Sequence, residues 1–189
     1  MSNLMTEDDF NFLLNGPHRS YYEGRWEYFS VVLRMIEGIH PNRVLEIGPG
    51  WMPVVKDADL MYAPEEDQFG RPDSAHGQIF IHDATQKPWP FEDCVYDLVV
   101  ALNVFEHLDN KQSRAFREVM RITHHAILTV PFCWTGGESR WMHRIHRDID
   151  RELVKDWTLG IEPCEIVEIP RVGSKFAQGP RLVYHWEFK

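Results

Sequence analysis

The hydrophobic positions along the chain predict an alternation of strands and helices. Short, nearly continuous apolar runs, typical of strands buried on both faces of a sheet, occupy residues 44–47, 58–62, 78–82, 96–103, 126–130, 165–169 and 181–188. Apolar residues at three- and four-residue spacing predict helices over about 10–14, 22–37, 113–122 and 148–157. This order predicts a mainly parallel sheet with helices on both faces, and the last two runs predict a closing hairpin with an antiparallel final strand.

The run at residues 44–47 ends in a glycine turn. It reads Val-Leu-Glu-Ile, and Gly48 and Gly50 follow at once. Glycines there let the chain turn sharply and let a ligand approach the backbone. Glu46 lies inside the apolar run, where a carboxylate is costly unless a polar or cationic group meets it. The pattern predicts the ligand-binding end of a strand, and the alternative is an ordinary strand that ends in a glycine turn.

The connection after Gly50 is unusually short. Residues 51–57 leave little room for a helix before the next apolar run, whereas a parallel crossover usually needs about a dozen residues. We therefore expect an abbreviated crossover of about one turn. The alternative is that residues 58–62 are not a strand of the sheet.

Bulk properties narrow the class of protein. A length of 189 residues suits a single domain over 1–189, with residues 1–40 as an N-terminal helical cap. A formal net charge of -9 argues against general affinity for nucleic acid or an anionic membrane. No apolar stretch approaches a membrane span or a signal peptide. Three widely spaced cysteines favour a reducing cytosol, so we expect a cytoplasmic protein.

Four motifs in order resemble the class I S-adenosylmethionine-dependent methyltransferases. They are Val-Leu-Glu-Ile-Gly-Pro-Gly at 44–50, His-Asp-Ala-Thr at 82–85 with Pro-Trp-Pro-Phe at 88–91, Tyr-Asp-Leu-Val at 96–99, and Asn-Val-Phe-Glu-His-Leu at 103–108. The resemblance spans about residues 43–132 and implies the family's Rossmann-like, seven-stranded sheet. A dinucleotide-binding enzyme fits less well, because Pro53 stands where its third glycine belongs.

The resemblance implies S-adenosylmethionine as the methyl donor and assigns residues to it. Gly48 and Gly50 would let the amino-acid tail lie against the backbone, with Glu46 near its ammonium group. Asp83 would accept a hydrogen bond from the adenine amino group. The remaining donor-binding residues that we expect are Ala84, whose backbone would contact the adenine, and Asn103 and Phe105, which would flank the methionine portion.

One position departs from the family pattern. The family usually places an acidic residue, which binds the ribose hydroxyls, at the end of the second strand. Here that position holds Ala63. Glu65 or Glu66 could supply the carboxylate from just beyond, and we take Glu65 as the candidate. The departure keeps a catalytically silent, methyltransferase-like binding protein open as an alternative.

Fewer sequence features indicate which residues contact the methyl acceptor. Because methyl transfer is an in-line displacement, positioning supplies much of the catalysis, and a base is needed only for a protonated acceptor. His107 is the candidate base, with a structural histidine as the alternative. The segment after the fifth strand offers Trp134, His143 and His146 as acceptor contacts, and no metal site is predicted. We expect a small-molecule acceptor, with a protein or nucleic-acid methyltransferase as the other enzyme class; the acceptor and the oligomeric state are not readable from the sequence.

Overall fold

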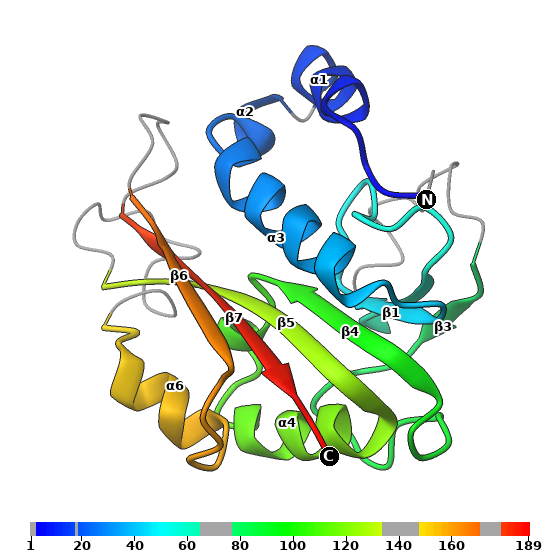
Figure 1. Cartoon of the computed structure of the whole chain (residues 1–189), viewed down its shortest axis with the longest axis vertical. Coiled ribbons are helices and arrows are strands. Elements are labelled where there is room, and N and C mark those ends of the chain that lie inside the picture. The colour runs from blue at the N-terminus through cyan, green and yellow to red at the C-terminus, as the bar shows by residue number, and fades with distance from the viewer. Residues whose placement is uncertain (1–2, 18, 65–76, 134–147, 171–178) are drawn as a thin grey trace.

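The central feature of the structure is a seven-stranded mixed sheet. A computed structural model describes residues 3–17, 19–64, 77–133, 148–170 and 179–189. In these residues the strand order is β3-β2-β1-β4-β5-β7-β6 (Figure 1). The strands are β1 Val44–Ile47, β2 Asp59–Tyr62, β3 Ile79–Ile81, β4 Tyr96–Leu102, β5 Thr123–Pro131, β6 Glu165–Ile169 and β7 Arg181–Glu187. β7 is antiparallel to both β5 and β6, and the other pairs are parallel, which confirms the predicted fold class.

Helices cover both faces of the sheet, as predicted. On one side lie α1 (Glu7–Asn15), α2 (Arg19–Tyr22) and α3 (Trp26–Ile39), and on the other lie α4 (Gln112–Ile122) and α6 (Arg151–Trp157) (Figure 1). A short helix, η2 (Phe105–His107), follows β4. The two faces have separate apolar clusters, because each strand buries side chains both ways. None of the helices in the described ranges is long and apolar enough to cross a membrane.

The helix predicted over residues 22–37 begins later than expected and is preceded by a separate short helix. α2 ends at Tyr22, and α3 begins only at Trp26. The break occurs because Gly24 has a φ of 75°, which a helix does not accommodate. The division turns α2 away from the axis of α3 and places Tyr22 against the glycine turn after β1, where its hydroxyl accepts a hydrogen bond from Trp51 N at 3.3 Å.

The crossover from β1 to β2 contains no helix. Residues 48–58 form turns only, and β1 and β2 still pair in parallel, so the expected abbreviated crossover is confirmed. The N-terminal segment covers the resulting loop. Met5 N donates to Val54 O at 2.8 Å, and Leu4 forms an antiparallel bridge with Val55. The chain's first residues therefore lie where a crossover helix would otherwise pack.

We predict that the α4 face carries a large share of the stability. Phe116 is fully buried between α4 and the sheet, with its ring 5.3 Å from that of Trp186. Phe116→Ala should lower the free energy of unfolding by ~3–5 kcal/mol, because it removes apolar contacts and leaves a cavity. Urea denaturation measures the change. Phe12→Ala is the control, since the Phe12 side chain is 72% exposed on α1. Equal losses in the two variants would contradict this account of the core.

Candidate functional site

The loops after the parallel strands meet at the carboxyl edge of the sheet. Gly48 follows β1, and Val104 follows β4, the neighbouring strand. The two loops are in contact, because a Cβ atom built on Gly48 would lie 3.0 Å from Val104 Cγ2. Open α/β sheets bind ligands at this edge. The structure therefore brings together the first and last of the sequence motifs.

The glycine turn after β1 has a backbone that only glycine adopts readily. Gly48 has a φ of 58° and Gly50 a φ of 67°. The Tyr62 hydroxyl on β2 donates to Gly50 O at 3.3 Å, and a Cβ atom at Gly50 would lie 3.5 Å from the Tyr22 hydroxyl. The turn is thus held from two sides by tyrosines, with its backbone accessible to a ligand because neither glycine carries a side chain.

Glu46 is buried beneath this turn. Its side chain is 1% exposed, and Oε2 accepts a hydrogen bond from Val54 N at 2.8 Å. Burial raises the pKa of Glu46 to about 8, although hydrogen bonds from the backbone of Val54 and Val55 favour the charged form. The carboxyl group fixes the loop that replaces the crossover helix. Its predicted place beside a ligand ammonium group stays a prediction.

Asp83 and Ala84 follow β3. Asp83 Oδ1 accepts from Thr85 N at 2.8 Å, and Oδ2 accepts from Gln86 Nε2 at 3.4 Å. Partial burial opposes ionisation, but the hydrogen bonds from Thr85 prevail and lower the pKa of Asp83, so the carboxylate is charged at neutral pH. Ala84 is buried, and its carbonyl accepts from Trp89 Nε1 at 3.2 Å. Both residues stay predicted adenine contacts.

Asn103 is held in a strained conformation at the end of β4. Its φ is 57°, a region that asparagine tolerates better than most residues. Thr129 Oγ1 donates to Asn103 Oδ1 at 3.2 Å, and Asn103 Nδ2 donates to the Tyr28 hydroxyl at 3.3 Å. Phe105 lies nearby with its ring in the core, 6.5 Å from that of Phe116. The amide is thus oriented by β5 on one side and by α3 on the other.

The acceptor candidates are only partly described. His107 is exposed at the end of η2, and its role as a base stays a prediction. The other candidates, Glu65, Trp134, His143 and His146, lie outside the described residues. Within the part of the chain that is described, no group of three or more His, Cys, Asp or Glu side chains could hold a metal ion.

The sequence reading missed a cationic cluster beside Asn103. Arg25 Nη1 donates to the Tyr28 hydroxyl at 2.9 Å, and the Arg181 guanidinium lies 5.0 Å from the centroid of the same ring. Arg181 is the first residue of β7 and is 5% exposed. Its only sequence signal was a charge at the start of an apolar strand. By sequence, Arg25 could cover a ligand together with Tyr21 and Tyr22, but aromatic residues at this spacing usually mark a core.

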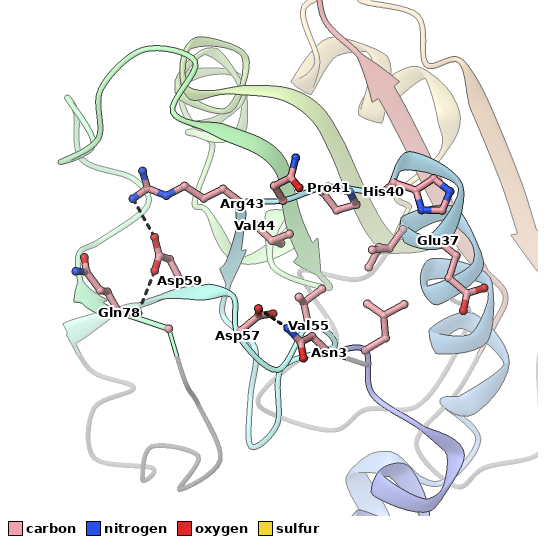
Figure 2. A pocket seen from close by; sticks show the side chains of 14 residues that line it. Asn3, Glu37, His40, Pro41, Arg43, Val44, Val55, Asp57, Asp59 and Gln78 are labelled. Atoms are coloured by element: carbon pink, nitrogen blue, oxygen red, sulfur yellow. Dashed lines mark hydrogen bonds and ion pairs between the residues drawn. The ribbon is translucent and has the colours of Figure 1, made fainter. Parts of the chain in front are cut away.

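A separate cavity lies at the opposite, amino edge of the sheet. It has a volume of about 870 Å³ and lies between the end of α3, the N-terminal segment and the starts of β1 to β3 (Figure 2). Arg43 reaches Asp59 Oδ2 at 3.3 Å, and Asn3 Nδ2 donates to Asp57 Oδ2 at 2.5 Å on its wall. None of the predicted site residues lines it. The cavity is therefore distinct from the carboxyl-edge site.

Comparisons with known proteins agree with this geometry. Residues 60–126 match the family described as a methyltransferase domain. Similar solved structures include the methyltransferase domain of bacterial CtHen1, at 12% identity and a TM-score of 0.62, covering 87% of this chain and 100% of that one. The matched residues and the shared fold are consistent with a class I methyltransferase. This class uses S-adenosylmethionine as its methyl donor, so the resemblance seen in the sequence is confirmed.

Two further solved structures show how the methyltransferase fold is used elsewhere. The N-terminal domain of EvdMO1, in the presence of S-adenosylhomocysteine and D-fucose, has a TM-score of 0.58 and 12% identity, covering 85% of this chain and 83% of that one. The [4+2]-cyclase SpnF has a TM-score of 0.58 and 13% identity, covering 83% and 81%. These likenesses establish the fold. A search of curated protein sequences gives no significant match.

The residues of the methyltransferase domain fit part of a donor molecule. The two glycines leave the backbone after β1 without side chains, as the resemblance requires for an amino-acid tail, and the Asp83 carboxylate lies just after β3, where the resemblance places the adenine. Ala63 follows β2 and has no polar side chain for a ribose. Glu65 and Glu66, the carboxylates considered in its place, lie outside the described residues.

We predict that Glu46 makes stability fall as pH rises. The folded protein keeps a proton on Glu46 up to about pH 8, whereas the unfolded chain releases it near the ordinary value of 4.5. Stability from this group is complete below pH 4.5 and is lost as pH rises through 8, with a slope of up to about 1.4 kcal/mol per pH unit. Glu46→Gln should flatten this pH profile, because an amide does not titrate. The loop should stay formed, because the amide oxygen can still accept from Val54 N.

Urea denaturation between pH 5 and 9 provides the measurement. Glu27→Gln, on the exposed side of α3, is the matched control and should leave the slope unchanged. An unchanged slope in Glu46→Gln would show that the buried carboxyl group is ionised throughout this pH range.

Proposed function

We propose that this methyltransferase domain transfers a methyl group from S-adenosylmethionine to a small-molecule acceptor. The observation that carries the proposal is the contact between the glycine turn after β1 and the loop after β4, at the same carboxyl edge of the sheet where Asp83 follows β3. A small acceptor agrees with the net charge of -9, which disfavours nucleic acid. The likeness to a domain solved with S-adenosylhomocysteine and a sugar supports the same class.

The donor supplies a methyl group on a positively charged sulfur, ready for attack by a lone pair. The chain's own residues bind and orient. Gly48 and Gly50 admit the tail to the backbone, and Asp83 holds the adenine amino group. Asn103, fixed by Thr129 and Tyr28, orients the reacting centre from the β4 side. His107 takes up the proton where the acceptor carries one. Positioning therefore accounts for most of the rate.

Two other functions remain as candidates. Ala63 favours a catalytically silent binding protein, because the usual ribose contact is missing from the position where the family has it. The likeness to a [4+2]-cyclase shows that this fold also serves other chemistry. A protein or nucleic-acid methyltransferase is the third candidate, and the acidic chain disfavours it.

The cysteines support a cytoplasmic location. Cys94, Cys133 and Cys164 are all free and exposed. Exposed free thiols suit a reducing compartment, because they would pair or oxidise elsewhere. We therefore propose that the protein works in the cytoplasm.

Donor binding is the first test of the proposed function. Isothermal titration calorimetry with S-adenosylhomocysteine should give saturable heat with one site per chain. Folded protein that gives no heat at millimolar ligand would rule the function out. If binding is found but methyl transfer to a panel of small acceptors is not, the silent binding protein becomes the better explanation.

We predict that Asp83→Asn weakens S-adenosylhomocysteine binding by about 1.5–3 kcal/mol, roughly 10- to 150-fold. An asparagine keeps the oxygen that accepts from Thr85 N, so the turn after β3 stays formed. It replaces the other oxygen with a donor, which cannot accept from the adenine amino group. Glu92→Gln is the control, on the exposed loop before β4. Unchanged affinity in Asp83→Asn would show that Asp83 only caps its own turn.

A further inference from the structure

The cationic cluster lies where an acceptor would approach the donor. Arg181 opens β7 and pairs with Pro131, the last residue of β5, so it lies at the carboxyl edge. Arg25 lies in the turn between α2 and α3, above the same edge, and Tyr28 joins it to Asn103 through one hydroxyl group. The cluster is therefore in direct contact with a residue that we assign to the donor site.

The Arg25 side chain is fixed in place. Its Nε donates to Tyr21 O, its Nη1 donates to the Tyr28 hydroxyl, and its guanidinium stacks 3.7 Å from the centroid of the Tyr21 ring. Among the described residues, no carboxylate lies within ion-pair distance of Arg25. These contacts hold the planar guanidinium by one edge and one face, and none of the hydrogen bonds to described residues uses Nη2. A guanidinium oriented in this way presents a donor to a ligand at low entropic cost.

Among the described residues, the cluster brings a buried and a half-buried guanidinium group close together. Arg181 and Arg25 repel each other, and burial and this repulsion both lower the pKa of Arg181. Glu106, which is 3% exposed on η2, is the nearby carboxyl group. Burial raises the pKa of Glu106 to about 8 in spite of the attraction of both arginines, so the group is mostly neutral at pH 7. Two guanidinium groups thus face one neutral acid.

Tyr28 has a hydrogen to offer as well. Its hydroxyl oxygen accepts from both Arg25 and Asn103, which fills its two lone pairs. The hydroxyl hydrogen must therefore point to a third group. Together with the arginines it forms a set of donors suited to an oxyanion, which is the ligand that guanidinium groups bind most specifically.

We propose that the methyl acceptor carries an oxyanion, a carboxylate or a phosphate, and that Arg25, Arg181 and the Tyr28 hydroxyl bind it. This inference rests on the proposed function, since it names the substrate class of the same site. It also explains why a chain with a net charge of -9 places two arginines together at this edge. The oxyanion is held near Asn103 and so anchors the acceptor beside the donor.

The test uses a carboxylate and an amide of nearly equal shape, with a phosphate ester as a second oxyanion. Benzoate and phenyl phosphate carry the oxyanion, and benzamide is the neutral counterpart. Binding is measured by calorimetry and thermal shift, with and without saturating S-adenosylhomocysteine. We expect benzoate or phenyl phosphate to bind and benzamide to bind about tenfold more weakly or not at all. The tighter of the two oxyanions identifies carboxylate or phosphate as the preferred group.

Variants locate the binding site. Arg25→Gln should weaken the oxyanion probes about tenfold or more, and Arg25→Lys should recover only part of the loss, because an ammonium lacks the planar fork. Tyr28→Phe should weaken them too, while it preserves the buried ring. Arg34→Gln is the matched control, because Arg34 is exposed on α3. This variant should bind the oxyanion probes as the wild type does. Circular dichroism and the unfolding midpoint of Arg25→Gln verify that the variant is folded, because its S-adenosylhomocysteine affinity could change through Tyr28 and Asn103.

The outcomes separate the two proposals. If S-adenosylhomocysteine binds but the oxyanion probes bind no better than benzamide, or Arg25→Gln behaves like Arg34→Gln, the oxyanion site is wrong and the methyltransferase function stands. If S-adenosylhomocysteine does not bind, the proposed function is wrong, and the probes without it still decide the oxyanion site.

Discussion

The hydrogen bond from Val54 N to the buried Glu46 carboxyl group holds the ligand-binding edge together. A class I sheet needs a firm turn after β1, yet here no crossover helix follows to anchor it. Glu46 anchors it from within the strand instead, at a distance of 2.8 Å. Burial raises the pKa of this group to about 8, so it is protonated and uncharged at neutral pH. A neutral, hydrogen-bonded acid is far less costly in a core than an ion.

The missing helix also explains the cavity at the amino edge. A crossover helix between β1 and β2 would normally pack beside α3 on this face. In its place stand a loop and the N-terminal segment, which pairs with that loop through Leu4 and Val55. A loop of turns and a short N-terminal segment fill less volume than a helix does. The space of about 870 Å³ bordered by Asn3, Asp57 and the end of α3 is what remains (Figure 2).

The sheet was predicted well because each buried strand corresponds to a short apolar run in the sequence. The runs at 44–47, 96–103 and 165–169 lie within a residue of the strands that form. The division of α2 from α3 was missed, because Gly24 sits in a helical pattern and its φ of 75° is not visible there. The abbreviated crossover was predicted from length alone, since seven residues cannot hold a helix and both turns.

The position of a candidate residue in the fold was predictable where it follows a strand, and was not predictable where its contacts are long-range. Gly48, Asp83 and Asn103 each follow a strand, so their place at the carboxyl edge was predictable from the fold. Arg181 was not, because it begins an antiparallel strand whose start reaches that edge only through pairing with β5. Arg25 was not either, since its partners are fixed by the break between α2 and α3 rather than by helical spacing.

Tyr28 is the physical link between the two halves of the proposed site. Its hydroxyl accepts one hydrogen bond from Arg25 on the acceptor side and one from Asn103 on the donor side. Its ring faces Arg181, and its burial leaves it little freedom to serve one side without the other. A ligand that moves Arg25 therefore changes the hydrogen bonding of Asn103. The effect of removing the Tyr28 hydroxyl must therefore be measured on both donor binding and acceptor binding, because the same oxygen orients both side chains.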